Sequence, residues 1–229
     1  MATIASAEPS PEAFQILFDK DYFVGNGPAS IAVGVWGDVA RHARFSGAFD
    51  KPETEPRVMP NLTKLPTWAD KELIHAVVET PRGSRCKLEF DTKLRAFTLA
   101  KPLLVGLTYP YDWGFIPSTK AEDGDSLDVL VIHDAATYPG LVLRCKPIGV
   151  LELVQITDGS EERNDRIFAV PERSPFEGDL QDVRRLPARA IEELEKFFEA
   201  TDALEDKKLK FLGWRGPTHA VKSIKRLSL

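Results

Sequence analysis

A series of short apolar or alternating segments occupies the middle of this 229-residue chain. The segments cover residues 76–79, 87–91, 97–99, 129–132, 141–143, 147–153 and 167–170. Short runs rich in Val, Ile, Leu and Phe, bounded by turn-forming residues, predict β-strands. Several short strands at this spacing predict a small barrel.

Two of these segments predict which side chains lie together. Residues 87–91 alternate strictly, so Lys87 and Glu89 share one face of the strand, opposite its apolar side chains. Residues 97–99 can return as the hairpin partner of this strand. The segment 129–132 is apolar throughout, which is typical of a strand in a barrel or sandwich core.

Two segments near the C-terminus have helical periodicity instead. Pro187 suits a first helical turn, and the apolar residues that follow it recur at helical spacing: Ile191, Leu194, Phe197 and Phe198. A second, shorter helix is expected over residues 218–227, also with one apolar side. We interpret both apolar stripes as core packing against the strands.

The first 70 residues differ in composition from the rest. Residues 1–12 are small, polar and proline-containing, which is typical of disordered chain ends. Residues 50–66 contain four prolines and resemble a connector laid over a surface. We therefore predict an N-terminal extension over residues 1–70, partly disordered or packed on a surface, and one domain over residues 71–229.

The charge, the apolar pattern and the cysteines exclude several classes of protein. A net charge of −5 and a pI near 5.5 argue against broad, non-specific nucleic-acid binding. The chain lacks the run of about 18 apolar residues that a membrane span needs, and its N-terminus lacks signal-peptide features. Cys86 and Cys145 lie in apolar or strand-like runs, where a reduced thiol is expected. We therefore expect a soluble cytoplasmic protein with neither nucleic-acid nor membrane partners.

Three aspartates within six residues precede an apolar strand: Asp123, Asp125 and Asp128. Each carboxylate disfavours ionisation of its neighbours, and a bound cation removes that cost. Mg²⁺ prefers hard oxygen ligands, and Gly124 permits the tight backbone that lets such oxygens converge. A solvated acidic turn fits the local sequence equally well. An EF-hand is excluded, because Leu127 would occupy a ligand position and Asp128 the position that requires glycine.

The residues around this cluster resemble the soluble family I inorganic pyrophosphatases. Residues 123–129, Asp-Gly-Asp-Ser-Leu-Asp-Val, are similar to that family's signature. Similar segments occur in order at residues 109–117, 139–140, 144–151, 169–171, 197–199 and 213–214. The resemblance covers residues 72–227, with one small insertion near 154–164, and it favours a metal site over a solvated turn.

The resemblance implies a mainly β fold with flanking helices, namely a five-stranded, OB-like barrel with two or more helices packed outside. It implies hydrolysis of pyrophosphate to two phosphates with several Mg²⁺ ions; Mn²⁺ or another divalent ion is the alternative. It also implies a homo-oligomer.

The resemblance assigns roles to individual residues. The metal positions correspond to Asp123, Asp125, Asp128, Asp158, Glu89 and one of Asn164 and Asp165. The substrate-binding positions correspond to Lys87, Lys101, Arg166, Glu79 and Trp113. Asp125 falls on the position that takes the proton from the nucleophilic water held by the metal. The alternation that places Lys87 and Glu89 on one face agrees independently with these roles.

Several residues at the expected substrate site depart from the family pattern. Thr201 and Asp202 replace a tyrosine–lysine pair that contacts one phosphate, so a negative charge lies where a positive one is expected. Lys101 replaces an arginine and loses its bidentate geometry. Trp113 replaces a tyrosine and offers no phenolic oxygen. Asn164 replaces an aspartate but still offers a neutral oxygen.

These departures leave several functions open. The leading hypothesis is a magnesium-dependent phosphoanhydride hydrolase acting on pyrophosphate, followed by the same fold acting on a different phosphorylated substrate. A non-catalytic member that binds metal is a third. A binder of single-stranded nucleic acid would need a basic groove with exposed aromatics, which the sequence does not suggest. Lys207, Lys208 and Lys210 lie near the altered pair and could compensate for it, but we expect them to be solvated surface lysines.

Overall fold

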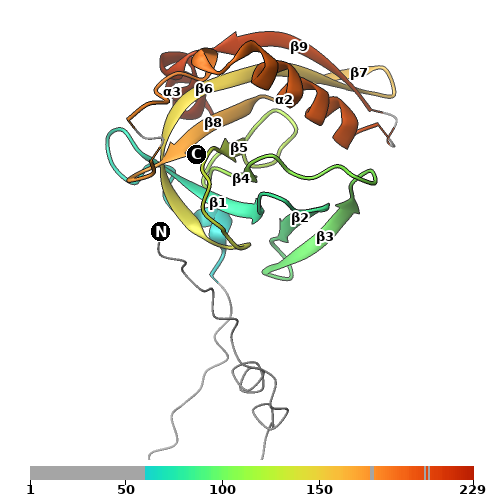
Figure 1. The fold of residues 1–229 in the computed structure, drawn as a ribbon. Coiled ribbons are helices and arrows are strands. Elements are labelled where there is room, and N and C mark those ends of the chain that lie inside the picture. The colour runs from blue at the N-terminus through green and yellow to red at the C-terminus, as the bar shows by residue number, and fades with distance from the viewer. Residues whose placement is uncertain (1–59, 176–177, 204, 206) are drawn as a thin grey trace, which may run out of the picture. The chain divides into compact units, whose positions relative to one another are not determined.

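The computed structural model describes residues 60–175, 178–203, 205 and 207–229. The described residues form a strongly curved sheet with helices on its outer side (Figure 1). Most of the predicted extension, residues 1–59, lies outside the described residues, and its predicted character stays a prediction.

The secondary structure follows the order of the chain. Its elements are η2 (Leu62–Lys64), β1 (Ile74–Thr80), β2 (Cys86–Asp91), β3 (Ala96–Pro102), β4 (Asp112–Phe115), β5 (Asp128–Val131), β6 (Val142–Thr157), β7 (Ser160–Arg163), β8 (Arg166–Pro171), η3 (Val183–Arg185), α2 (Ala188–Thr201), β9 (Lys207–Arg215) and α3 (Pro217–Leu227). Strands dominate, as the sequence predicts.

Five strands close into a ring. β1 pairs with β4, β4 with β5, β5 with β8, β8 with β6, and β6 returns to β1. The β5–β8 pair is parallel and the other four are antiparallel. β6 is long enough, at 16 residues, to continue past the ring and pair with β7 and β9. The ring confirms the predicted five-stranded barrel; β2 and β3 form a separate hairpin beside it.

The apolar character of β5 follows from burial on both of its faces. Val129 and Val131 lie in one buried cluster, while Leu130 and Ile132, which alternate with them, lie in another. Successive side chains of a strand point to opposite faces, so a strand with both faces covered needs apolar residues throughout.

Two helices cover the sheet and confirm the predicted apolar stripes. α2 buries Leu194, Phe197 and Phe198 in one cluster, and α3 buries Ala220 and Ile224 in the other. In the described part of the chain, none of the helices has the length and apolar character that a membrane crossing needs.

Several strands differ from the sequence prediction, among them β4, β6 and β9. The predicted segments 141–143 and 147–153 belong to one strand, β6, whose register shifts at Pro147–Gly149. β4 is unpredicted because Gly114 interrupts its apolar pattern. β9 is unpredicted because its first residues are lysines, yet it pairs with β6 along most of its length.

The residues before β1 pack against the barrel. Leu62 is buried beside Phe90 and Phe115, and Trp68 forms a bridge with Ile74. This packing brings Thr63 of η2 to the edge of the pocket described below.

Candidate active site

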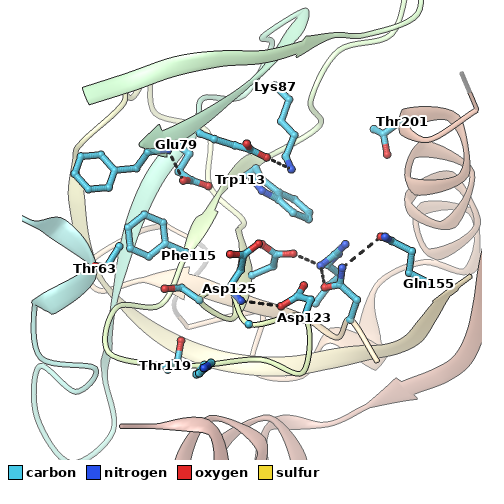
Figure 2. A pocket seen from close by; sticks show the side chains of 18 of the residues that line it. Thr63, Glu79, Lys87, Trp113, Phe115, Thr119, Asp123, Asp125, Gln155 and Thr201 are labelled. Atoms are coloured by element: carbon cyan, nitrogen blue, oxygen red, sulfur yellow. Dashed lines mark hydrogen bonds and ion pairs between the residues drawn. The ribbon is translucent and has the colours of Figure 1, made fainter. Parts of the chain in front are cut away.

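A pocket of about 800 Å³ lies at the end of the ring where β4 ends and β5 begins. Figure 2 shows its walls, with Glu79 and Lys87 on one side and Thr201 of α2 on the other. The predicted site residues that line it are Glu79, Lys87, Glu89, Lys101, Trp113, Asp123, Asp125, Asp128, Asn164 and Arg166. Most of the predicted site therefore gathers in one place, although its residues come from six strands and two loops of the chain.

The loop before β5 presents the aspartates to this pocket. Gly124 has a φ of +90°, a conformation that residues with a Cβ rarely adopt. The turn is closed by the Ala121 N–H, which donates to the backbone oxygen of Asp125 at 2.8 Å, and by the Asp125 N–H, which donates to the Asp123 carboxylate at 3.1 Å. Asp128 follows as the first residue of β5.

Burial and repulsion from neighbouring carboxylates disfavour the ionised forms of Asp125 and Asp128. Burial raises the pKa of Asp125, and the charges of Asp123 and Glu89 raise it further. Burial also raises the pKa of Asp128, while the guanidinium of Arg166 opposes that rise. The carboxylates therefore require compensating positive charge, which a bound cation would supply.

Arg166 supplies part of that charge. Its Nη1 donates to the carboxylate of Asp128 and to the side-chain oxygen of Asn164. The guanidinium carbon lies 4.9 Å from the ring centroid of Trp113, which is cation–π geometry. Arg166 Nε is a buried nitrogen with no hydrogen-bond partner in the described part of the chain. Trp113 thus contacts Arg166 through the face of its ring. This contact does not depend on the phenolic oxygen of the tyrosine that Trp113 replaces.

The donor set of the pocket fits a hard divalent ion. Its carboxylate and amide oxygens are the ligands that Mg²⁺ prefers. In the described ranges, no group of three or more His, Cys, Asp or Glu side chains is arranged to hold one ion. An ion here would therefore take one or two protein carboxylates and complete its coordination with water and substrate oxygens, which is how Mg²⁺ usually binds at phosphate sites.

Strands β1 and β2 add further acidic and basic side chains to the pocket, namely Glu79, Lys87 and Glu89. Lys87 Nζ lies 2.5 Å from the Glu89 carboxylate, in agreement with the predicted shared face. Burial opposes the charge of Lys87, but Asp128 and Glu89 outweigh it and raise the pKa of this lysine. Glu79 accepts a hydrogen bond from the Phe90 N–H at 2.8 Å, and burial raises the pKa of its carboxyl to about 8.

We predict that Glu79→Gln changes how stability depends on pH. The pKa of Glu79 is about 8 in the folded protein against 4.5 for the ordinary group, so the wild type loses stability as pH rises through this interval. The stability of the variant relative to wild type should rise by up to about 1.4 kcal/mol per pH unit in this range. Urea unfolding of chelator-treated protein measures it. Parallel curves for the two proteins would contradict the shifted pKa.

The structure places Asn164 and Asp165, the two alternative candidates for one metal ligand, in different surroundings. Asn164 lines the pocket. Asp165 instead accepts hydrogen bonds from the Leu153 N–H at 3.2 Å and from Arg163 Nε at 2.5 Å, so its carboxylate is used outside the pocket. Asp158 lies in the turn between β6 and β7 with a φ of +52°, and it is not among the residues that line the pocket. The metal-binding roles of Asp158 and Asp165 stay predictions that this geometry does not support.

Two charged residues near the pocket, Glu205 and Lys207, differ from what the sequence predicts. Lys101 Nζ donates to Asp202 Oδ1 at 2.9 Å and also to Glu205. Glu205 in turn pairs with Lys207 at 2.8 Å. The sequence predicts a solvated Lys207, but this side chain is half-buried and lines the pocket. The contact of Glu205 with Lys101 joins residues distant in the chain, so the local sequence does not mark it.

Comparison with known proteins decides the family. Residues 76–228 match the family described as inorganic pyrophosphatase, which is more than half of the chain. The chain belongs to the inorganic pyrophosphatase family. Residues 1–75 lie outside the family match.

Individual pyrophosphatases are similar along most of their length. The inorganic pyrophosphatase of Synechocystis is 38% identical over 155 residues, covering 68% of this chain and 89% of the relative. That of Thermus thermophilus is 38% identical over 172 residues, covering 73% of this chain and 95% of the relative. The crystal structure of a Thermus thermophilus inorganic pyrophosphatase superposes with a TM-score of 0.67 at 35% identity, covering 73% of this chain and 96% of that one.

Proposed function

We propose that this chain hydrolyses inorganic pyrophosphate to two phosphates with the help of Mg²⁺. One observation carries the proposal: Asp123, Asp125 and Asp128 share a pocket with Lys87 and Arg166, in a chain that belongs to the pyrophosphatase family. Carboxylates that bind cations, beside cations that bind phosphate, suit a phosphoanhydride substrate.

Asp125 accepts the proton of the attacking water. Its carboxylate lies on a tight turn that lines the pocket, next to the carboxylate of Asp123, so it can reach a water molecule held there. Bound Mg²⁺ lowers the pKa of water and neutralises charge on the phosphates. Asp123, Asp128 and Asn164 would hold the ions, with Glu89 at the rim of the pocket.

Lys87 and Arg166 bind the phosphates. Both line the pocket; the negative charge of Asp128 raises the pKa of Lys87, and Arg166 donates a hydrogen bond to the Asp128 carboxylate. Arg166 offers a planar fork of N–H donors, the geometry that pairs best with phosphate oxygens. Substrate and metal would take over the contacts that Arg166 now makes with Asp128.

We predict that Asp128→Asn weakens divalent-ion binding. Losing one ligand carboxylate should raise the Mg²⁺ concentration for half-maximal activity at least about tenfold, as loss of supporting groups does at other metal sites. Direct Mn²⁺ binding, followed by electron paramagnetic resonance, provides a readout that does not need turnover. Asp134→Asn is the matched control, because Asp134 is exposed and lies outside the pocket lining. Equal ion affinity in the two variants would remove Asp128 from the metal site.

A different phosphorylated substrate is the second candidate function. Thr201, Asp202 and Trp113 line the pocket, and they differ from the residues that the family pattern places there. Initial rates on pyrophosphate, tripolyphosphate, ATP and a phosphate monoester, each with Mg²⁺, separate the candidates. The proposal requires the highest kcat/KM on pyrophosphate. A higher value on another compound favours the second candidate, and no turnover on any of them favours a non-catalytic protein.

We also propose a cytoplasmic homo-oligomer. The unpaired thiols of Cys86 and Cys145 suit a reducing compartment. Exposed apolar side chains such as Leu99, Tyr138 and Leu141 provide surface for contact between copies. Analytical ultracentrifugation distinguishes an oligomer from a monomer.

A further inference from the structure

Ion pairs connect the pocket wall at the end of α2 to the β2–β3 hairpin. Lys101, near the end of β3, donates from Nζ to Asp202 at 2.9 Å and to Glu205, which both follow α2. The side chains of Lys101 and Asp202 are 22% and 15% exposed, so this pair is well shielded from water. The contact joins two segments about a hundred residues apart and spans the pocket wall.

The charges on this wall balance. Glu205 also pairs with Lys207 at 2.8 Å, so two ammonium groups, of Lys101 and Lys207, face two carboxylates, of Asp202 and Glu205. Both lysines form hydrogen bonds that lower the pKa of Glu205 to about 2, so its carboxylate stays ionised at any working pH. This wall therefore offers no uncompensated positive charge to a phosphate, unlike a wall on which the lysines stood alone.

Thr201 does not replace the missing phosphate contact. Its hydroxyl donates to the backbone oxygen of Phe198 at 2.8 Å, which closes the last turn of α2. Lys101 lines this side of the pocket, and its Nζ already has two carboxylate partners.

We propose that Asp202 and Glu205 are positioning residues that hold Lys101 and thereby limit the affinity of the pocket for the phosphate end of its substrate. The proposal rests on the proposed function, since it concerns the same pocket. Asp202 acts through Lys101 rather than by direct contact with substrate. Removing either carboxylate should release positive charge toward the anion.

The test uses Asp202→Asn in the full chain. We expect the Kd of imidodiphosphate with Mg²⁺, measured by calorimetry, to fall about fivefold, the size typical of one partly solvated charge pair. The KM for pyrophosphate should fall similarly while kcat changes less than about twofold, because the aspartates of the loop are untouched. Glu205→Gln should act in the same direction. Glu193→Gln, on the exposed face of α2, should change neither value.

A double-mutant cycle decides whether Asp202 acts through Lys101. In a Lys101→Met background, Asp202→Asn should give no gain in affinity. The same gain in both backgrounds would show direct repulsion of the substrate and overturn the positioning role. An unchanged or weaker affinity of both single variants, or no binding of imidodiphosphate by any variant, would overturn it as well. The calorimetric Kd does not require turnover, so a wild type that fails to hydrolyse pyrophosphate would contradict the proposed function and leave this test decisive.

Discussion

Asp125→Asn should lower kcat for pyrophosphate by about 10²- to 10⁴-fold, the range typical of a lost general base. An amide cannot accept the proton of the attacking water at neutral pH, although it has nearly the shape of the carboxylate. The backbone hydrogen bonds that form the turn, from Ala121 to Asp125 and from Asp125 to Asp123, should persist. Phosphate release at saturating Mg²⁺ measures kcat.

The controls separate loss of chemistry from loss of fold. The melting temperature of Asp125→Asn should match or exceed that of the wild type, because the substitution removes a carboxylate whose pKa is raised by burial and by Asp123 and Glu89. Asp134→Asn should retain wild-type kcat. Wild-type turnover by Asp125→Asn would exclude Asp125 as the base, and a collapsed fold in this variant would leave the role to be tested by Asp125→Ser.

Gly114→Ala should destabilise the barrel by about 3 kcal/mol or more, the range of severe overpacking. A Cβ at Gly114 would lie 1.8 Å from the backbone oxygen of Val77 and 3.1 Å from the Cα of Val78. These atoms belong to the paired strand β1, so no side-chain rotation relieves the clash. The melting temperature should fall by about 10 °C, given the usual entropy of unfolding for a domain of this size.

Gly178→Ala is the matched control for this prediction. A Cβ at Gly178 meets nothing within 4 Å, and its φ does not lie in the left-handed region. Its melting temperature should stay close to that of the wild type. If Gly114→Ala melts as the control does, the close approach of β4 to β1 is not a constraint on this fold.

The sequence predicts β5, β8 and the acidic loop well because their signals are local. β5 and β8 are buried on both faces, so their apolar runs are visible without a partner. The acidic turn is marked by Gly124 and by three aspartates in six residues. Local sequence left a solvated turn equally plausible, and the surrounding segments resolved the choice in favour of a metal site, a role that stays a prediction.

The other features of the fold and site depend on strand pairing and ion pairs between distant parts of the chain, which no local sequence pattern encodes. β9 begins with lysines that look solvated, and its strand character comes from hydrogen bonding to the extended part of β6. The choice between Asn164 and Asp165, which lie between β7 and β8, depends on hydrogen bonds that bind Asp165 to Arg163 and to the Leu153 N–H, while Asn164 lines the pocket. Glu205 is joined to the site region by its ion pairs with Lys101, which is distant in the chain, and with Lys207.

Phosphate release from pyrophosphate, measured with and without added divalent ions, tests the central claim most directly. The wild-type protein should release two phosphates for each pyrophosphate consumed in the presence of Mg²⁺, and release should stop when the ions are chelated. Turnover near zero with Mg²⁺, Mn²⁺, Co²⁺ and Zn²⁺ alike would contradict the account.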